Sequence, residues 1–160
     1  YGTDPVPVGK PEPVEPDKSN VDTSKKLHCT ISIDCATILN NLADLDPAKL
    51  DVLPTDGVIL NAVTVEFSEG ESVFDVLQRV CRENNIHIEA TFTPGYNSAY
   101  VEGIHNLYEF DCGELSGWMY SVNGWFPNYG CSRYALQDGD VIRWRYTCDL
   151  GADVGGSMVA

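Results

Sequence analysis

The side chains best suited to bind a ligand gather between Gly117 and Cys148, a stretch that holds all three tryptophans of the 160-residue chain. Asn123-Gly124 in its middle is a strong signal for a hairpin turn. The aromatic residues that follow this turn cannot all point inward, so they form either a lid packed on the sheet edge or an exposed platform for a ligand. The candidate ligand-binding residues on both sides of the turn are Trp118, Tyr120, Trp125, Phe126, Asn128 and Tyr129.

Residues with the spacing of a catalytic or metal site are not evident. The three histidines, His28, His87 and His105, belong to no HExxH-type motif, and Ser116-Gly117 lacks the glycine pattern of a nucleophile elbow. The aspartates of 44–56 and 138–140 lack the twelve-residue spacing of a calcium loop. We therefore expect a protein that is not an enzyme and that holds no metal ion.

Alternating apolar and polar side chains predict the strands that must position the aromatic residues. Before the turn, Trp118, Tyr120 and Val122 share one face of a strand, and the last strand places Ile142, Trp144 and Tyr146 on its core face. The other predicted strands are 27–34, 58–67 with a bulge or a join near Asn61-Ala62, 86–93, and 99–107 around Gly103, which an irregular loop follows.

Two segments have helical periodicity. Residues 35–45 predict a short helix. Residues 68–85 predict the main helix, because Ser72 and Asp75 have the spacing of a capping box and the apolar residues form one stripe: Val73, Val76, Leu77, Val80 and Cys81. The order of elements predicts an α+β, β-grasp-like mixed sheet with one main helix packed on one face, in which the first and last strands are parallel neighbours.

Composition divides the chain into three parts. Residues 1–27 contain five of the nine prolines and predict a proline-rich linker or stalk. Residues 28–150 form the folded domain, and 151–160 a flexible tail.

The six cysteines show no CxxC pair, which leaves either three disulfides or free thiols, since Cys81 lies on the apolar face of the predicted helix. Parallel first and last strands bring Cys35 and Cys148 side by side. We predict a disulfide between these two, which would close a loop of over a hundred residues and contribute roughly 4 to 5 kcal/mol.

The formal charge of −14 disfavours nucleic acid and anionic membrane surfaces as partners. No apolar run approaches the length of a membrane span, so we expect no membrane insertion in this segment. The expected partners are other domains of a larger surface protein or an extracellular ligand.

The motifs GWMYSVNGWFPNYG and YALQDGDVIRWRYTCDLG, together with SEGESVFDVLQRVCRENN and YVEGIHNLYEF, carry a family resemblance. Over roughly residues 28–150 the sequence resembles a bacterial family of surface and secreted domains of unknown function, related to the C-terminal β-domain of transcobalamin and intrinsic factor. The resemblance implies an extracellular β-grasp-like module, often one of several in a cell-surface protein.

In the cobalamin carriers, the related domain closes over the corrinoid against a helical domain. This resemblance implies that the candidate residues from Trp118 to Tyr129 face a ligand, with cobalamin as a candidate cofactor, although the helical partner has no counterpart in these residues. Two hypotheses follow. The first is a non-catalytic extracellular binding or adhesion module on a bacterial cell surface, and the alternative is a small-molecule domain for cobalamin or a similar corrinoid.

Overall fold

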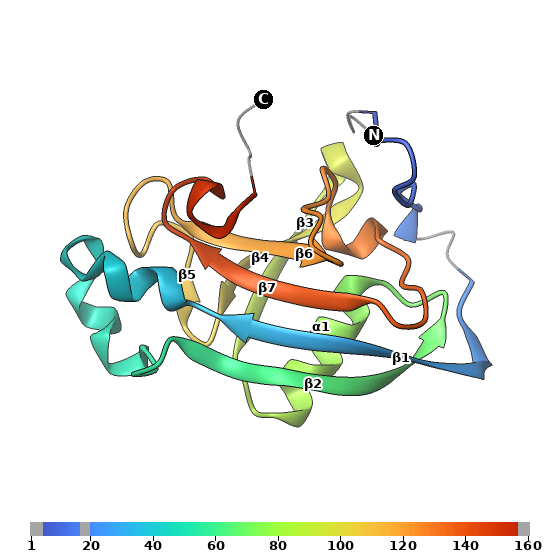
Figure 1. The fold of residues 1–160 in the computed structure, drawn as a ribbon, viewed down its shortest axis with the longest axis horizontal. Helices are drawn as coiled ribbons and strands as arrows, with labels where there is room; N and C mark the ends of the chain where they lie inside the picture. The colour runs from blue at the N-terminus through green and yellow to red at the C-terminus, as the bar shows by residue number, and fades with distance from the viewer. Residues whose placement is uncertain (1–4, 17–19, 157–160) are drawn as a thin grey trace.

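The computed structural model describes residues 5–16 and 20–156, which form an α+β fold with two sheets and a single main helix (Figure 1). The first sheet has four strands, in the spatial order β2 (Val58–Glu69), β1 (Asp22–Asp34), β7 (Val141–Thr147) and β6 (Gly117–Val122). β1 and β7 run parallel, with Ile31 opposite Ile142 and Ile33 opposite Trp144, and the other pairs are antiparallel. The mixed sheet with parallel first and last strands, predicted from the sequence, is confirmed.

The main helix, α1 (Val73–Glu83), packs its apolar stripe into the core. Ser72 Oγ accepts a hydrogen bond from the Asp75 N–H at 3.1 Å, and the Asp75 carboxylate accepts one from the Ser72 N–H at 2.9 Å. This reciprocal pair satisfies two amide donors that the first turn leaves free. The predicted capping box is therefore confirmed, and the predicted stripe is buried, from Val73 to Cys81.

The second sheet lies beside β6 and has the order β3 (Ile88–Thr93), β4 (Ser98–Ile104), β5 (Leu107–Tyr108). His105 and Asn106 connect β4 to β5 with φ values of 57° and 59°, a conformation that suits a tight hairpin. The predicted irregularity in β2 is also present, because the pairing with β1 shifts between Ile31 and Ile33, opposite Asn61-Ala62.

The predicted helix at 35–45 is replaced by short 3-10 helices. These are η2 (Ala36–Asn40), η3 (Leu42–Asp44) and η4 (Pro47–Val52). Asn41 ends the first one, where its N–H bonds to the Ile38 carbonyl and its side chain donates to the Thr37 carbonyl at 2.9 Å. The apolar spacing fits a longer helix, but the local hydrogen bonds of Asn41 interrupt it. The remaining 3-10 turns are η5 (Pro94–Tyr96), η6 (Cys131–Arg133) and η7 (Ala152–Val154).

The two end segments pack on the domain where the structure describes them. β1 begins at Asp22, inside the segment predicted as a stalk, and residues 5–16 lie along the loop that follows β6 (Figure 1). Residues 151–156 fold back on the sheet, where the Gly151 N–H donates to Thr147 Oγ1 at 2.7 Å. No helix within the described residues is long and apolar enough to cross a membrane.

Candidate functional site

A pocket of about 470 Å³ opens between β4, β6 and the loop that follows β6. We call it the aromatic pocket, because aromatic side chains from three parts of the chain form most of its wall. Its lining residues are Ala99, Tyr100, Val101, Trp118, Met119, Tyr120, Phe126, Pro127, Asn128, Tyr129, Gly130, Cys131 and Trp144. Five of the six candidates from the sequence line it. None of these lining residues carries a formal charge at neutral pH.

β6 supplies the floor of the pocket. Its alternation turns Trp118 and Tyr120 inward, where each ring packs against a residue of β7: Trp118 meets Tyr146 edge-on, and Tyr120 lies beside Trp144, both with centroids 5.3 Å apart. Both rings also use their polar ends. The Trp118 indole N–H donates to the Leu107 carbonyl at 2.8 Å, so one bond ties β6 to β5 and fixes the ring orientation.

The loop that follows β6, which we call the aromatic loop (residues 125–131), forms one wall of the pocket. The hydroxyl of Tyr120, on β6, donates to the Tyr129 carbonyl at 2.7 Å and so joins β6 to this loop. At its far end, Gly130 lies so close to Ser98 that a β-carbon there would sit 1.5 Å from Ser98 Oγ. Only glycine allows the loop to approach β4 at this distance.

The proline-rich segment holds the aromatic loop from outside. The Tyr129 hydroxyl donates to the Pro11 carbonyl at 2.7 Å, and the Asn128 amide donates to the Pro5 carbonyl at 3.3 Å. The Lys10 ammonium lies over the Trp125 ring, 5.6 Å from its centroid. The two hydrogen bonds use free carbonyl groups of an extended proline-rich backbone, and the contact of Lys10 with Trp125 is a cation–π interaction.

Trp125 is the one candidate that does not line the aromatic pocket. It borders a separate cleft of about 340 Å³, beside Lys10 and Tyr134. Tyr129 is buried like a lid, whereas Trp125 and Phe126 are half-buried and Asn128 is exposed. The two alternatives for the aromatic loop, lid and platform, therefore apply to different residues.

Burial sets the electrostatics of the pocket. It raises the pKa of Tyr120 and of Tyr129 well above the ordinary value for a phenol, so both stay neutral at physiological pH. Trp144 is 2% exposed, and its indole nitrogen has no hydrogen-bond partner. A neutral, largely aromatic surface suits an uncharged planar or apolar ligand better than an ion.

Sequence reasoning missed Tyr100 and Val101, which β4 brings to the same pocket. The alternation of 99–107 indicated a strand there, but it does not show which strand pairs beside β6. That neighbour is fixed by contacts between β4, β6 and η6.

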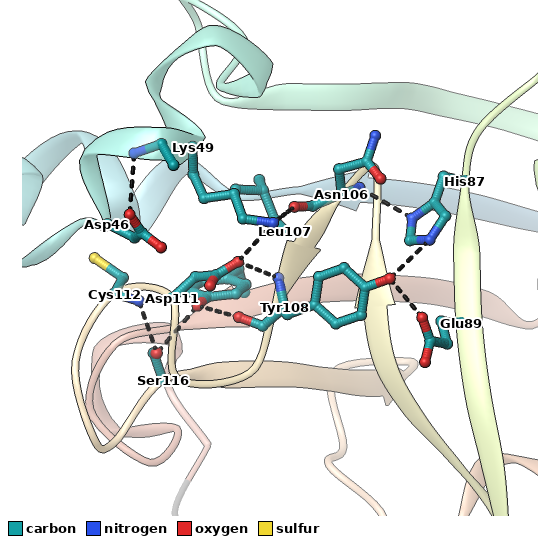
Figure 2. Close-up of polar contacts among 12 residues, drawn as sticks. Asp46, Lys49, His87, Glu89, Asn106, Leu107, Tyr108, Asp111, Cys112 and Ser116 are labelled. Carbon is teal, nitrogen blue, oxygen red and sulfur yellow. Dashed lines mark hydrogen bonds and ion pairs between the residues drawn. The ribbon is translucent and has the colours of Figure 1, made fainter.

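A second group of polar side chains lies around the β4–β5 hairpin (Figure 2). The Tyr108 hydroxyl donates to Glu89 Oε1 at 2.6 Å and lies 2.9 Å from His87 Nε2. His87 Nδ1 accepts from the Asn106 N–H at 3.1 Å, so both ring nitrogens have a partner within the group. The hydrogen bond to Glu89 raises the pKa of Tyr108 to about 12, and the phenol cannot act as a base at neutral pH.

Lys49 completes this polar group from η4. Its ammonium donates to the Asn106 carbonyl at 2.7 Å, lies 3.5 Å from the Asp111 carboxylate, and stands 4.9 Å from the centre of the Tyr108 ring (Figure 2). These contacts connect η4 to the β4–β5 hairpin and to the loop after β5, and the Tyr108 hydroxyl extends the group to Glu89 of β3. The group, which we call the clasp (Lys49, His87, Glu89, Asn106, Tyr108 and Asp111), therefore joins these elements to one another. None of its interactions points to a bound ligand.

The remaining candidates for a functional site are metal ligands and disulfides. Within residues 5–16 and 20–156, no three His, Cys, Asp or Glu side chains are grouped so that they could hold a metal ion. All six cysteines are free thiols in the structure. The disulfide between Cys35 and Cys148 that the sequence suggests stays a prediction.

Comparison with known proteins supports the same architecture. Residues 70–148 match the family described as "Domain of unknown function (DUF4430)", a range that runs from the end of β2 to the end of β7 and includes the aromatic pocket. No curated protein matches the chain.

The solved structures that match this chain include the following two. One is haptocorrin in complex with Cbi, at 14% identity and a TM-score of 0.56, covering 84% of this chain. This chain spans only 28% of the haptocorrin chain. The other, from Ruminococcus gnavus ATCC 29149, is described as a "putative metal binding protein", at 14% identity and a TM-score of 0.43, covering 76% of this chain and 96% of that one. Residues 70–148 thus match the DUF4430 family model, and the fold is similar to that of haptocorrin, in agreement with the transcobalamin-like resemblance that the sequence motifs indicate.

Proposed function

We propose that this protein is a non-catalytic binding module and that the aromatic pocket is its ligand site. One observation carries the proposal: five residues singled out from the sequence meet Tyr100 and Trp144 around a single pocket of about 470 Å³. Sites for small molecules usually occupy about 300 to 1,000 Å³ and combine apolar walls with a few polar groups.

The lining defines the ligand class. Burial keeps the phenols of Tyr120 and Tyr129 neutral, and the protein as a whole carries a charge of −14, so phosphates and other anions are disfavoured. The ligand we propose is an uncharged planar group, stacked against the aromatic walls. Asn128 and Tyr100 are the exposed residues of the lining that carry polar groups.

A corrinoid is the second candidate ligand. It is supported by the fold shared with haptocorrin, whose structure holds Cbi. A corrinoid is larger than the aromatic pocket, so it would rest across the mouth between β4 and the aromatic loop and leave its other face for a second surface. Other domains of a larger protein are the partners that would supply this surface.

The setting we propose is the bacterial cell surface or the extracellular space, with adhesion as one use of the binding module. Two features support it: the family resemblance of the sequence motifs and the acidic charge, which is unsuited to nucleic-acid partners. The proline-rich segment would lead from the domain toward neighbouring parts of the same protein.

The test compares two equivalent substitutions. N-Phenyl-1-naphthylamine, an uncharged aromatic fluorophore, is titrated into the wild type, Phe126→Ala and Phe110→Ala. Phe126 lines the aromatic pocket, whereas Phe110 is 64% exposed and lies outside it. We expect saturable binding by the wild type, an affinity about tenfold lower for Phe126→Ala, equivalent to about 1.4 kcal/mol, and no change for Phe110→Ala. Absence of binding, or equal losses in both variants, would overturn the proposal.

A further inference from the structure

Two cysteine side chains meet on one short segment beside the end of β7. Cys148 Sγ lies 3.5 Å from Thr37 Oγ1, and Cys112 Sγ lies 3.4 Å from the Asn41 carbonyl oxygen. Thr37 and Asn41 are one helical turn apart, and the Asn41 side chain donates to the Thr37 carbonyl at 2.9 Å. The two sulfurs therefore contact neighbouring groups of η2 and its C-cap residue, and each cysteine influences the pKa of the other.

The backbone holds Cys112 in this place independently. Its N–H donates to Ser116 Oγ at 3.1 Å, and the Tyr146 hydroxyl lies 3.0 Å from the same oxygen. The residue after Ser116 is Gly117, which pairs with Thr147 in the antiparallel register of β6 and β7. The loop that carries Cys112 is thus fixed directly beside the residue that precedes Cys148.

Cys35 is less well placed than Cys112 to pair with Cys148. Asp34 lies opposite Arg145 in the parallel register of β1 and β7, which puts Cys35 level with Tyr146, two residues before Cys148. Both cysteines lie one residue past the end of their strand, and on straight strands a rise of about 3.3 Å per residue and a spacing of about 4.8 Å would separate two α-carbons at this stagger by roughly 8 Å. Disulfides rarely span more than about 7 Å between α-carbons.

We propose that Cys112 and Cys148 form a redox-active pair that closes into a disulfide when a small-molecule disulfide accepts their electrons. The half-buried Cys148 reacts first: its thiolate attacks the external disulfide, forms a mixed disulfide and releases one external thiolate. The Cys112 thiolate then attacks Cys148 Sγ and releases the second. The two cysteines lose two electrons and two protons, and the external disulfide leaves as two thiols.

The disulfide between Cys112 and Cys148 would link the loop between β5 and β6 to the end of β7. These segments frame one end of the sheet, where Tyr146 and Ser116 already connect them. Burial raises the pKa of Cys112 to about 12 and also raises that of Cys148, so only a small fraction of either is thiolate at neutral pH and we expect the exchange with the external disulfide to be slow.

Mass spectrometry of the full chain tests the pair. The protein is incubated with oxidised glutathione, alkylated, and digested with trypsin and Glu-C, which put Cys112, Cys131 and Cys148 on separate peptides. We expect the peptide of Cys112 joined to that of Cys148, and a Tm higher by roughly 5 to 15 °C that a reductant reverses. The Cys131→Ser control should keep the link. In Cys112→Ser, Cys148 should instead carry glutathione.

Two results would overturn the proposal. One is a link from Cys148 to the peptide that contains Cys29 and Cys35, which would favour the pairing predicted from the sequence. The other is full alkylation of both Cys112 and Cys148 after oxidation in a protein that remains folded by circular dichroism.

Discussion

The Tyr120 hydroxyl offers the sharpest test of how the aromatic loop is held over its pocket. It donates to the Tyr129 carbonyl at 2.7 Å, and both residues are less than one tenth exposed. In Tyr120→Phe the ring keeps its contact with Trp144, centroid to centroid 5.3 Å, so little packing is lost. What changes is that a buried carbonyl loses its donor.

The magnitude follows from that loss. An average neutral hydrogen bond contributes about 0.5 to 1.5 kcal/mol, but leaving a buried partner unsatisfied costs about 1 to 3 kcal/mol. Because water has little access to the Tyr129 carbonyl, we expect the free energy of unfolding of Tyr120→Phe to fall by about 1 to 3 kcal/mol. Urea unfolding followed by circular dichroism measures it, with an unchanged m value showing that the unfolding mechanism is the same.

Tyr129→Phe is the matched control, because it removes the same atom from the outer side of the aromatic loop. Its hydroxyl donates to the Pro11 carbonyl in a part-buried position, where water has more access than at the Tyr120 bond, so we expect a loss of about 0.5 to 1.5 kcal/mol. The reasoning is refuted if Tyr120→Phe lies within about 0.5 kcal/mol of the wild type, or if Tyr129→Phe is the more damaging of the two.

Three further predictions concern the glycine contact, the clasp and alkaline pH. Gly130→Ala should destabilise the protein by more than about 2 kcal/mol, since its β-carbon would overlap Ser98, whereas Gly95→Ala, with open space around it, should cost less than about 0.5 kcal/mol in the same urea assay. Tyr108→Phe should cost less than about 1.5 kcal/mol and leave the affinity for the naphthylamine probe unchanged, and lost binding would place the clasp in the ligand site. Burial raises the pKa of Tyr134 and of Cys81 to about 12, so above pH 9 to 10 the unfolded chain loses protons that the native state keeps, and stability should fall by about 1.4 kcal/mol per pH unit for each such group. Equal urea midpoints at pH 8 and pH 11 would contradict this.

Much of the fold could be predicted because it depends on local periodicity. The alternation around Trp144 identified the core face of β7, and the spacing of Ser72 and Asp75 located the start of α1. The parallel pairing of β1 and β7 followed from the order of the elements. These features depend on which side chains must be buried, and the spacing of apolar residues along the sequence indicates those side chains directly.

The candidate site could be predicted only in part. The turn at Asn123-Gly124 identified the aromatic loop, but Trp125 points to another cleft, and Tyr100 reaches the aromatic pocket from a strand whose position in space the sequence does not reveal. The contact between Tyr129 and Pro11 joins residues 118 positions apart. Such pairings depend on tertiary packing, which local patterns of polarity do not encode.

The central claim, that the aromatic pocket is the ligand site, is tested most directly by the three tryptophan indole N–H signals in a ¹H–¹⁵N spectrum. Trp118 and Trp144 line the pocket, whereas Trp125 borders the other cleft, so the protein carries both probe and control. On titration with N-phenyl-1-naphthylamine, and separately with cobinamide, we predict saturable shifts of the Trp118 and Trp144 signals and an unchanged Trp125 signal. A shift of Trp125 alone, or no shift of any indole signal with either ligand, would contradict the claim.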